Sequence, residues 1–255
     1  MDTLDKKTIR RFAIPSSDAD VSHFLKPGAF MDLAQEIAYV SAASLGFGYE
    51  DLQRYGTAWV LSRMHIEFPS LPRWRDEVEL QTWHKGFEGP FYVRDFRMLG
   101  PDGKPAVLAT SSWLIIDVAS RRLLRREHLA EKLPLDTVCA DSAIDEPCDK
   151  VMMPPEGMEE IAEHVVAYSD VDFVGHANNA RYVVWAMDCL DFETVRSRRV
   201  RSLRINFNKE LLPGETVEIF RAPVEGGWTV EGRSADRSSF CVEILFGPEE
   251  KAEAI

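Results

Sequence analysis

The chain has 255 residues, of which 45% are hydrophobic and 28% charged, a composition typical of globular proteins rather than disordered or fibrous ones. This length suits one large domain or two of roughly 100–150 residues. The net charge of −12 argues against nucleic acid as a general partner, and no apolar stretch reaches the ~18 residues of a membrane span. A charged N-terminus without an apolar signal core favours a cytoplasmic location.

The cysteines and histidines give no support for a metal site or a redox motif. The four cysteines form no CxxC pair, and the six histidines lack the HExxH spacing. We therefore expect structural thiols in a reducing compartment, and neither a metal ion nor another cofactor.

The first half predicts a strand, a long helix and an antiparallel meander. A short strand at 12–14 ends in a turn-rich run, and a helix is expected from Pro27, where apolar residues recur at three- and four-residue intervals until Gly46. A second short helix is predicted at 49–55. Strands separated by turns that contain glycine or proline are predicted at 59–68, 78–83, 92–99 and 107–118.

The second half repeats this plan after a linker. Residues 130–160 contain four prolines and no clear period, which indicates a connection between two units. A strand is predicted at 162–167, followed by one helix that Asn178 or Asn179 caps and that runs to about Arg196. Further strands are predicted at 200–207, 215–220, 228–233 and 240–245. Each half therefore predicts an antiparallel sheet wrapped on one long helix, and the halves should pack as pseudo-symmetric units.

Two separate segments of the chain occur twice, which indicates a duplicated fold unit. Ser-Asp-Ala-Asp at 17–20 returns as Ser-Asp-Val-Asp at 169–172, and the segment 66–80 returns at 205–219 without a gap. The two copies differ at chemically important positions, because the first has Phe24 and Leu71 where the second has His176 and Glu210. We expect a duplicated scaffold with one active site, in the second half.

Residues 170–182, which read DVDFVGHANNARY, resemble the motif of the acyl-acyl-carrier-protein thioesterases. Plant members of that family carry DLDVNQHVNNxxY at this point, and bacterial relatives carry DxDxNGHVNN. Similar segments at 59–63, 74–76, 111–116 and 121–123 follow the family's order, so the resemblance extends from about residue 12 to about residue 246.

The resemblance implies an α+β fold of the double hotdog type, two tandem units each with a long helix wrapped by an antiparallel sheet. It agrees with the elements expected from the residues themselves. We place an N-terminal hotdog unit at 1–130, which holds the substrate pocket without catalytic groups. A linker at 131–160 and a catalytic C-terminal hotdog unit at 161–255 complete the chain.

The family's catalytic residues fall on Asp172, His176 and Glu210 of this sequence. Two positions depart from the family pattern. The Asn between the Asp and the His is Val174 here, and the Cys that follows the Glu in plant members is Leu211. A cysteine nucleophile at that place is therefore impossible.

Thioester hydrolysis needs an activated water, a donor to the developing oxyanion and a leaving thiol. Glu210, if removed from water, could act as general base. His176 could position the water, donate to the carbonyl or pass a proton to the departing thiolate. Asp172 could orient the imidazole or the helix start, and the helix that begins at Asn178 and Asn179 offers free N–H groups to an oxyanion. Each residue alone has a bland explanation as a cap, a turn histidine or a solvated acid, but the set favours catalysis.

These features predict an enzyme of fatty acid biosynthesis that hydrolyses fatty acyl-acyl carrier protein to free fatty acid and holo-acyl carrier protein. Two alternatives stay open, an acyl-CoA thioesterase of the same fold and a non-catalytic acyl-binding hotdog protein. The acyl chain is expected against the first-half helix, at Met31, Ala34, Ile37 and Ala38. Because the two hotdog units can pack against each other within one chain, both a monomer and a homodimer agree with this expectation.

Arginines cluster at 121–126 and 196–201 in this otherwise acidic chain. An acidic carrier protein would dock on such a cluster, while a solvated charged surface explains the same pattern equally well.

Overall fold

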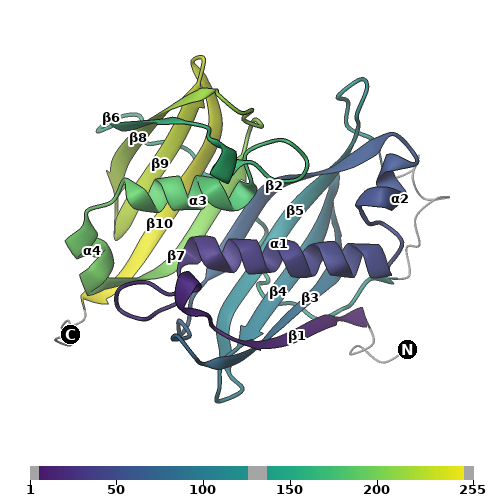
Figure 1. Cartoon of the computed structure of the whole chain (residues 1–255), viewed down its shortest axis with the longest axis horizontal. Coiled ribbons are helices and arrows are strands. Elements are labelled where there is room, and N and C mark those ends of the chain that lie inside the picture. The colour runs from purple at the N-terminus through teal and green to yellow at the C-terminus, as the bar shows by residue number, and fades with distance from the viewer. Residues whose placement is uncertain (1–5, 126–136, 250–255) are drawn as a thin grey trace.

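One antiparallel sheet of ten strands runs through both halves of the protein (Figure 1). We describe a computed structural model, in which residues 6–125 and 137–249 are placed. The strand order is β1-β3-β4-β5-β2-β7-β10-β9-β8-β6, so each half contributes five neighbouring strands. The halves join where β2 (Thr57–Glu67) pairs with β7 (Arg198–Phe207).

Each half has the same sequence of elements. The first contains β1 (Thr8–Ala13), α1 (Pro27–Ser44), α2 (Tyr49–Gln53), β2, β3 (Glu77–Glu88), β4 (Phe91–Leu99) and β5 (Pro105–Asp117). The second contains β6 (Glu159–Val165), α3 (Asn179–Asp188), α4 (Phe192–Ser197), β7, β8 (Thr216–Val224), β9 (Gly227–Ser234) and β10 (Arg237–Glu249). The predicted α+β architecture of two similar units, each a helix against an antiparallel sheet, is confirmed.

The helices α1 and α3 lie side by side on one face of the sheet (Figure 1). Pro27 occupies the first turn of α1, where its missing N–H has no partner to lose. The two helices approach closely at Gly28. A Cβ at this position would lie only 2.7 Å from Cγ2 of Val184, so a larger residue would push the helices apart. Residues of α1 that recur at helical spacing are buried against the sheet: Phe30, Met31, Ala34, Ile37, Ala38 and Ser41.

The duplication read from the sequence is visible as matched elements. A short 3-10 helix at Ser16–Asp18 has its counterpart at Tyr168–Asp170, 152 residues later, and β3 and β8 begin 139 residues apart. The change of spacing falls in the helical region, where α1 has 18 residues and α3 has 10.

The prediction of a single second-half helix reaching Arg196 was wrong. The helix α3 ends at Asp188, and α4 starts after Asp191, whose side chain accepts a hydrogen bond from the amide of Thr194 at 2.9 Å. An aspartate in that position caps a new helix, so the chain turns there instead of continuing.

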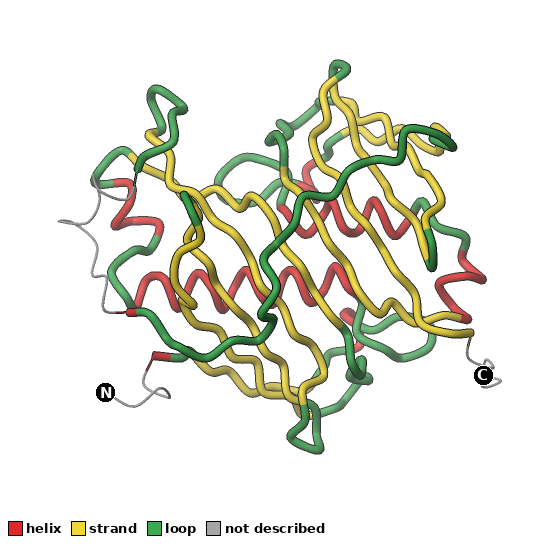
Figure 2. Tube along the Cα trace, turned by 180° about the vertical axis from the view of Figure 1, so that it is seen from behind, coloured by secondary structure: helices red, strands yellow, loops and turns green. Residues whose placement is uncertain are grey.

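The linker crosses the face of the sheet opposite the helices (Figure 2). Within its placed part, residues 137–158, the carbonyl of Asp141 accepts from Nε1 of Trp83 at 2.8 Å. Asn206 bonds both the N–H and the C=O of Val151, at 3.1 and 2.6 Å. These bonds hold the linker against the sheet; its predicted beginning at 131–136 lies outside the described residues.

Two further structural findings bear on the expected class of protein. All four cysteines lie in the described part of the chain, where they are buried and form no disulfide bond. In the described parts of the chain, no helix is both long and apolar enough to cross a bilayer.

Candidate active site

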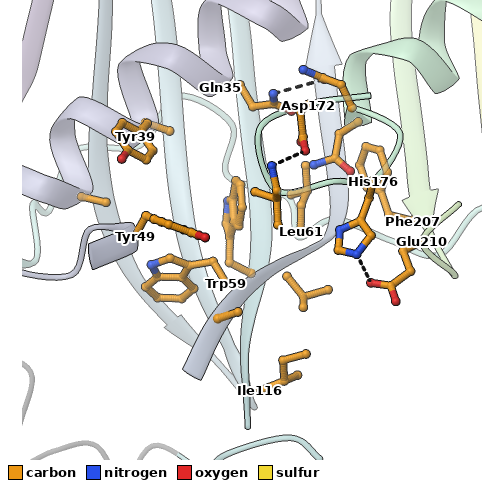
Figure 3. Close-up of a pocket in the computed structure, with 18 of the residues that line it drawn as sticks. Gln35, Tyr39, Tyr49, Trp59, Leu61, Ile116, Asp172, His176, Phe207 and Glu210 are labelled. Atoms are coloured by element: carbon orange, nitrogen blue, oxygen red, sulfur yellow. Dashed lines mark hydrogen bonds and ion pairs between the residues drawn. The ribbon is translucent and has the colours of Figure 1, made fainter. Parts of the chain in front are cut away.

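A cavity of about 1370 Å³ lies between the helices and the sheet and reaches from the first half into the second (Figure 3). Tyr39, Tyr49 and Trp59 line its first-half portion, and His176 and Glu210 lie at its second-half end. The cavity therefore connects the first half, where the substrate was expected, with the expected catalytic residues.

The loop that presents His176 is closed by its own backbone. The amide of Asp172 donates to the carbonyl of His176 at 2.9 Å, and Gly175 at φ 93° allows the tight turn between them. The carboxylate Oδ1 of Asp172 accepts from the amide of Val174 at 2.9 Å. Asp172 thus anchors the loop, and none of the described hydrogen bonds joins its carboxylate to the His176 ring.

Backbone pairing brings Glu210 next to His176. The amide of Ala177 donates to the carbonyl of Leu211 at 2.8 Å, and Leu211 itself is fully buried. The Tyr182 hydroxyl also bonds the Leu211 backbone, and burial raises the pKa of Tyr182 well above its usual range. In consequence His176 Nε2 lies 3.4 Å from Glu210 Oε2, with the ring turned toward the carboxylate (Figure 3).

The environment of Glu210 differs from the desolvated one that a buried base would have. Its side chain is 38% exposed, and it forms an ion pair with Arg121 of the first half. Arg121 Nη2 lies 2.9 Å from Oε1, and Arg121 Nη1 donates to Oε2 at 3.1 Å. Sequence reasoning placed Arg121 in a docking cluster; it lies 89 residues from Glu210, and no local pattern signals the pair.

The start of α3 supplies backbone donors at the cavity wall. Asn178 is the N-cap, and its Oδ1 accepts from the amide of Ala180 at 2.8 Å and from Nε2 of Gln35 at 3.2 Å. The amide of Arg181 donates to the carbonyl of Asn178 at 2.8 Å. None of the described groups accepts a hydrogen bond from the amide of Asn179, so this N–H is available to a ligand.

The four expected substrate residues have different surroundings. Ala38 lines the large cavity. Met31 and Ala34 border a neighbouring void of about 10 Å³, and Ile37 is buried in the main core. The sequence analysis missed the aromatic side chains that form much of the cavity wall: Trp59, Phe87, Tyr92 and Trp113.

Arg94 on β4 is a further lining residue that sequence reasoning missed. Its Nη1 donates to Ser41 Oγ at 3.0 Å and to Thr82 Oγ1 at 3.2 Å, and none of the described carboxylates forms a salt bridge with it. Burial lowers the pKa of Arg94 to about 10. Burial, with the charge of Arg94 beside it, lowers the pKa of His84 to about 4, so the imidazole is neutral near pH 7.

The described residues contain no group of three His, Cys, Asp or Glu side chains that could hold a metal ion. The polar groups at the second-half end of the cavity are an imidazole, a carboxylate, a guanidinium and a helix N-terminus. Such a set can accept and pass protons and can stabilise a developing oxyanion.

Comparison with known families gives matches to both halves of the chain. The profile described as the acyl-ACP thioesterase N-terminal domain matches residues 5–129, and that of the acyl-ACP thioesterase C-terminal domain matches residues 155–244.

Among curated proteins, the oleoyl-acyl carrier protein thioesterase of Coriandrum sativum is 24% identical over 216 residues, covering 75% of this chain and 56% of its own length. The dodecanoyl-[acyl-carrier-protein] hydrolase of Cinnamomum camphora is 24% identical over 256 residues, covering 92% and 63% respectively. The chain thus spans less than two thirds of these chloroplastic relatives.

Solved structures share the fold over nearly the whole chain. An acyl-ACP thioesterase from Bacteroides thetaiotaomicron matches with a TM-score of 0.88 and 22% identity, covering 97% of this chain and 100% of that one. The 12:0-ACP thioesterase of Umbellularia californica matches with a TM-score of 0.85 and 19% identity, covering 96% and 98%.

Proposed function

Since this chain belongs to the acyl-ACP thioesterase family, whose two domain profiles match most of it, we propose that it hydrolyses fatty acyl-acyl carrier protein. The products are a free fatty acid and holo-acyl carrier protein. The observation that carries the proposal is the pair His176–Glu210, 3.4 Å apart beside the start of α3, at the end of a cavity of about 1370 Å³.

In the proposed reaction, a water molecule attacks the thioester carbonyl carbon. Glu210 takes a proton from that water as the new C–O bond forms, and the open surroundings of its carboxylate give water access. The amide of Asn179 donates to the carbonyl oxygen as it becomes an oxyanion, with support from the positive end of α3. The C–S bond then breaks, and His176 passes the proton from Glu210 to the departing thiolate.

Asp172 acts on this chemistry through the loop. Its carboxylate accepts a hydrogen bond from the Val174 amide, and its own amide donates to the His176 carbonyl. These two hydrogen bonds keep the imidazole at the wall of the cavity. Val174, which replaces the family's Asn, lines the cavity with an apolar side chain, so the side-chain amide of that Asn is missing here.

The acyl chain is proposed to extend from His176 into the first half, across the strands and beneath α1. The path from β7 through β2 and β5 to β4 covers three strand spacings, about 14 Å at ~4.8 Å each. Ala38 and the aromatic wall would contact the chain, since both line the same cavity. Such a lining favours an apolar ligand through burial of its surface.

The deciding experiment measures thiol release from two substrates with the same acyl group, one on acyl carrier protein and one on CoA. We expect a much higher kcat/KM for the carrier substrate, and loss of release in the His176→Ala control. Preference for CoA would instead identify an acyl-CoA thioesterase. Tight acyl binding without any release would identify a non-catalytic acyl-binding protein.

Docking of the acidic carrier is proposed to use one of the arginine clusters. Charge reversal at Arg198, Arg199 and Arg201, or at Arg122 and Arg125, should raise KM for the carrier substrate at low salt and leave the CoA substrate little affected. Unchanged KM in both sets would exclude these clusters from docking. Of the other two arginines predicted in the first cluster, Arg121 is left out of this test because it pairs with Glu210, and Arg126 lies outside the described residues. The cytoplasmic location and the choice between monomer and homodimer stay predictions.

A further inference from the structure

The first half contributes a charged side chain to the candidate catalytic pair. Arg121 meets both oxygens of Glu210, through Nη2 at 2.9 Å from Oε1 and Nη1 at 3.1 Å from Oε2. Two parallel bonds between a guanidinium and a carboxylate fix the plane of the carboxylate as well as its place. The same Oε2 lies 3.4 Å from His176 Nε2.

The turn that follows β5 projects Arg121 toward the second half. The Oδ1 of Asp117 accepts from the amide of Ser120 at 2.7 Å, and the amide of Arg121 donates to the carbonyl of Asp117 at 2.9 Å. Arg121 has a φ of 56°, in the left-handed region that residues with a side chain rarely adopt. From this turn the Arg121 side chain reaches the Glu210 carboxylate.

We infer that Arg121 is a positioning residue, which holds the Glu210 carboxylate in the orientation that faces His176. The inference rests on the proposed function. Glu210 is 38% exposed, and of the described groups only Arg121 and His176 form an ion pair with its carboxylate. Without the guanidinium, the carboxylate can rotate toward bulk water, and Oε2 leaves the place where it takes the proton of the attacking water. The active site is thus completed by both halves of the chain.

An exposed arginine at the cavity could alternatively attract the acidic carrier protein, since the Arg121 side chain is 59% exposed. The two roles change different kinetic constants. A docking residue affects KM for the carrier substrate alone. A positioning residue affects kcat for every thioester, including a small one such as an acyl N-acetylcysteamine, which has no carrier to dock.

The test compares Arg121→Ala and Arg121→Lys with the wild type on acyl carrier protein and on the matched N-acetylcysteamine thioester. We expect Arg121→Ala to lower kcat about 10-fold or more on both substrates, because a misplaced catalytic group loses its geometry. Arg121→Lys should recover only part of this, since an ammonium keeps the charge without the two parallel bonds. The matched control is Arg11→Ala, which removes an exposed arginine–glutamate pair with Glu79 outside the cavity and should leave kcat unchanged.

A double mutant tests whether Arg121 acts through Glu210 or independently of it. In a Glu210→Gln background, Arg121→Ala should cause little further loss, because the group it positions is already disabled. Equal losses in both backgrounds, or a change confined to KM for the carrier substrate, would overturn the inference. So would an unaffected kcat in Arg121→Ala. Unfolding curves identify any variant that fails to fold, and Arg121→Lys then carries the comparison. A wild type without thioesterase activity contradicts the proposed function itself, and the inference with it.

Discussion

In the loop that carries His176, the amide of Asp172 donates to the carbonyl of His176 at 2.9 Å; in its first-half counterpart, the amide of Asp20 donates to the carbonyl of Phe24 at 2.8 Å. Each aspartate also accepts, through Oδ1, an amide hydrogen bond from two residues further on. The two backbones are therefore built alike, although only the second loop places a histidine at the cavity, facing a carboxylate. In both loops the aspartate therefore holds the turn, whether or not a histidine follows it at the cavity.

The surroundings of the two loops differ more than their backbones. The Phe24 ring lies between the guanidinium groups of Arg73 and Arg199, at 4.5 and 3.9 Å from the ring centroid. These cation–π contacts pack the position that His176 occupies in the second half. His176 instead borders the cavity and faces a carboxylate. The first copy of the loop is thus packed against arginine side chains, and the second borders the cavity.

The largest expected effect comes from removing the polar side chains that distinguish the second half from the first. His176→Ala and Glu210→Ala should each lower kcat by about 10²-fold or more, the scale of lost acid–base catalysis. The matched first-half changes, Phe24→Ala and Leu71→Ala, should lower the free energy of unfolding or substrate binding and leave the chemical step intact. Steady-state kinetics with unfolding curves check both halves. Near-normal turnover in Glu210→Ala would remove the proposed base.

A related change addresses the nucleophile. Leu211→Cys should not increase turnover, because water is the nucleophile in the proposed reaction and the Leu211 side chain is fully buried. Rapid formation of a covalent acyl-enzyme in this variant would contradict the water mechanism.

The second comparison concerns the aspartates. Asp172→Ala should lower kcat about 10-fold or more, because the loop that presents His176 loses the acceptor for the Val174 amide. Asp20→Ala removes an acceptor from the amides of Ser22 and Phe24. It should lower the free energy of unfolding by about 1 kcal/mol without changing kcat. Equal kinetic losses in both variants would mean that the loops are not functionally distinct.

The sequence predicted the repeated elements well because each is specified by local patterns. Alternating strands, a proline-initiated helix and the Asn178 cap all depend on residues close together in the chain. The break after Asp188 was missed because the apolar pattern continues through Cys189 and Leu190, which are buried even though they lie outside a helix. Tertiary packing, and not periodicity, decided that boundary.

The site was predicted less completely than the fold. The repeat and the family motif indicated His176 and Glu210, which lie together in the structure. Arg121 could not be found in this way, since its partner is 89 residues distant and on the other unit. The cavity wall was also ambiguous, because periodicity defines one apolar side of α1 without telling which residues face the sheet and which face the cavity.

The alanines of α1 can be tested one by one, because Ala38 and Ala34 have different surroundings. Ala38→Phe should shorten the preferred acyl chain, because Ala38 borders the large cavity and a phenyl ring would fill part of it. Ala34→Phe should mainly lower the free energy of unfolding, since Ala34 is 2% exposed within the core and overpacking costs about 1–3 kcal/mol. Product chain lengths from a mixed set of acyl carrier protein substrates check the first variant, and chemical unfolding checks the second. An unchanged product profile in a folded Ala38→Phe enzyme would place the acyl chain elsewhere.

The smallest expected effect concerns the tight turn of each loop. Gly175 has a φ of 93°, and His23 at the matching position of the first loop has a φ of 68°. Gly175→Ala should lower the free energy of unfolding by about 1 kcal/mol, because the new Cβ is strained in this backbone state. It should also lower kcat modestly, since His176 follows directly in the chain.

His23→Gly is the matching change in the first loop, where a histidine adopts the left-handed backbone state that Gly175 has in the second. Glycine relieves the strain of a left-handed histidine but adds freedom to the unfolded chain, so we expect a net change within about 0.5 kcal/mol. The variant should leave kcat unchanged, because the first loop presents no reacting group. Thermal or urea unfolding of both variants, with kinetics on the same samples, measures the pair. A kinetic loss in His23→Gly as large as that in Gly175→Ala would show that the first loop also influences the reaction, and that the division of roles between the two copies is incomplete.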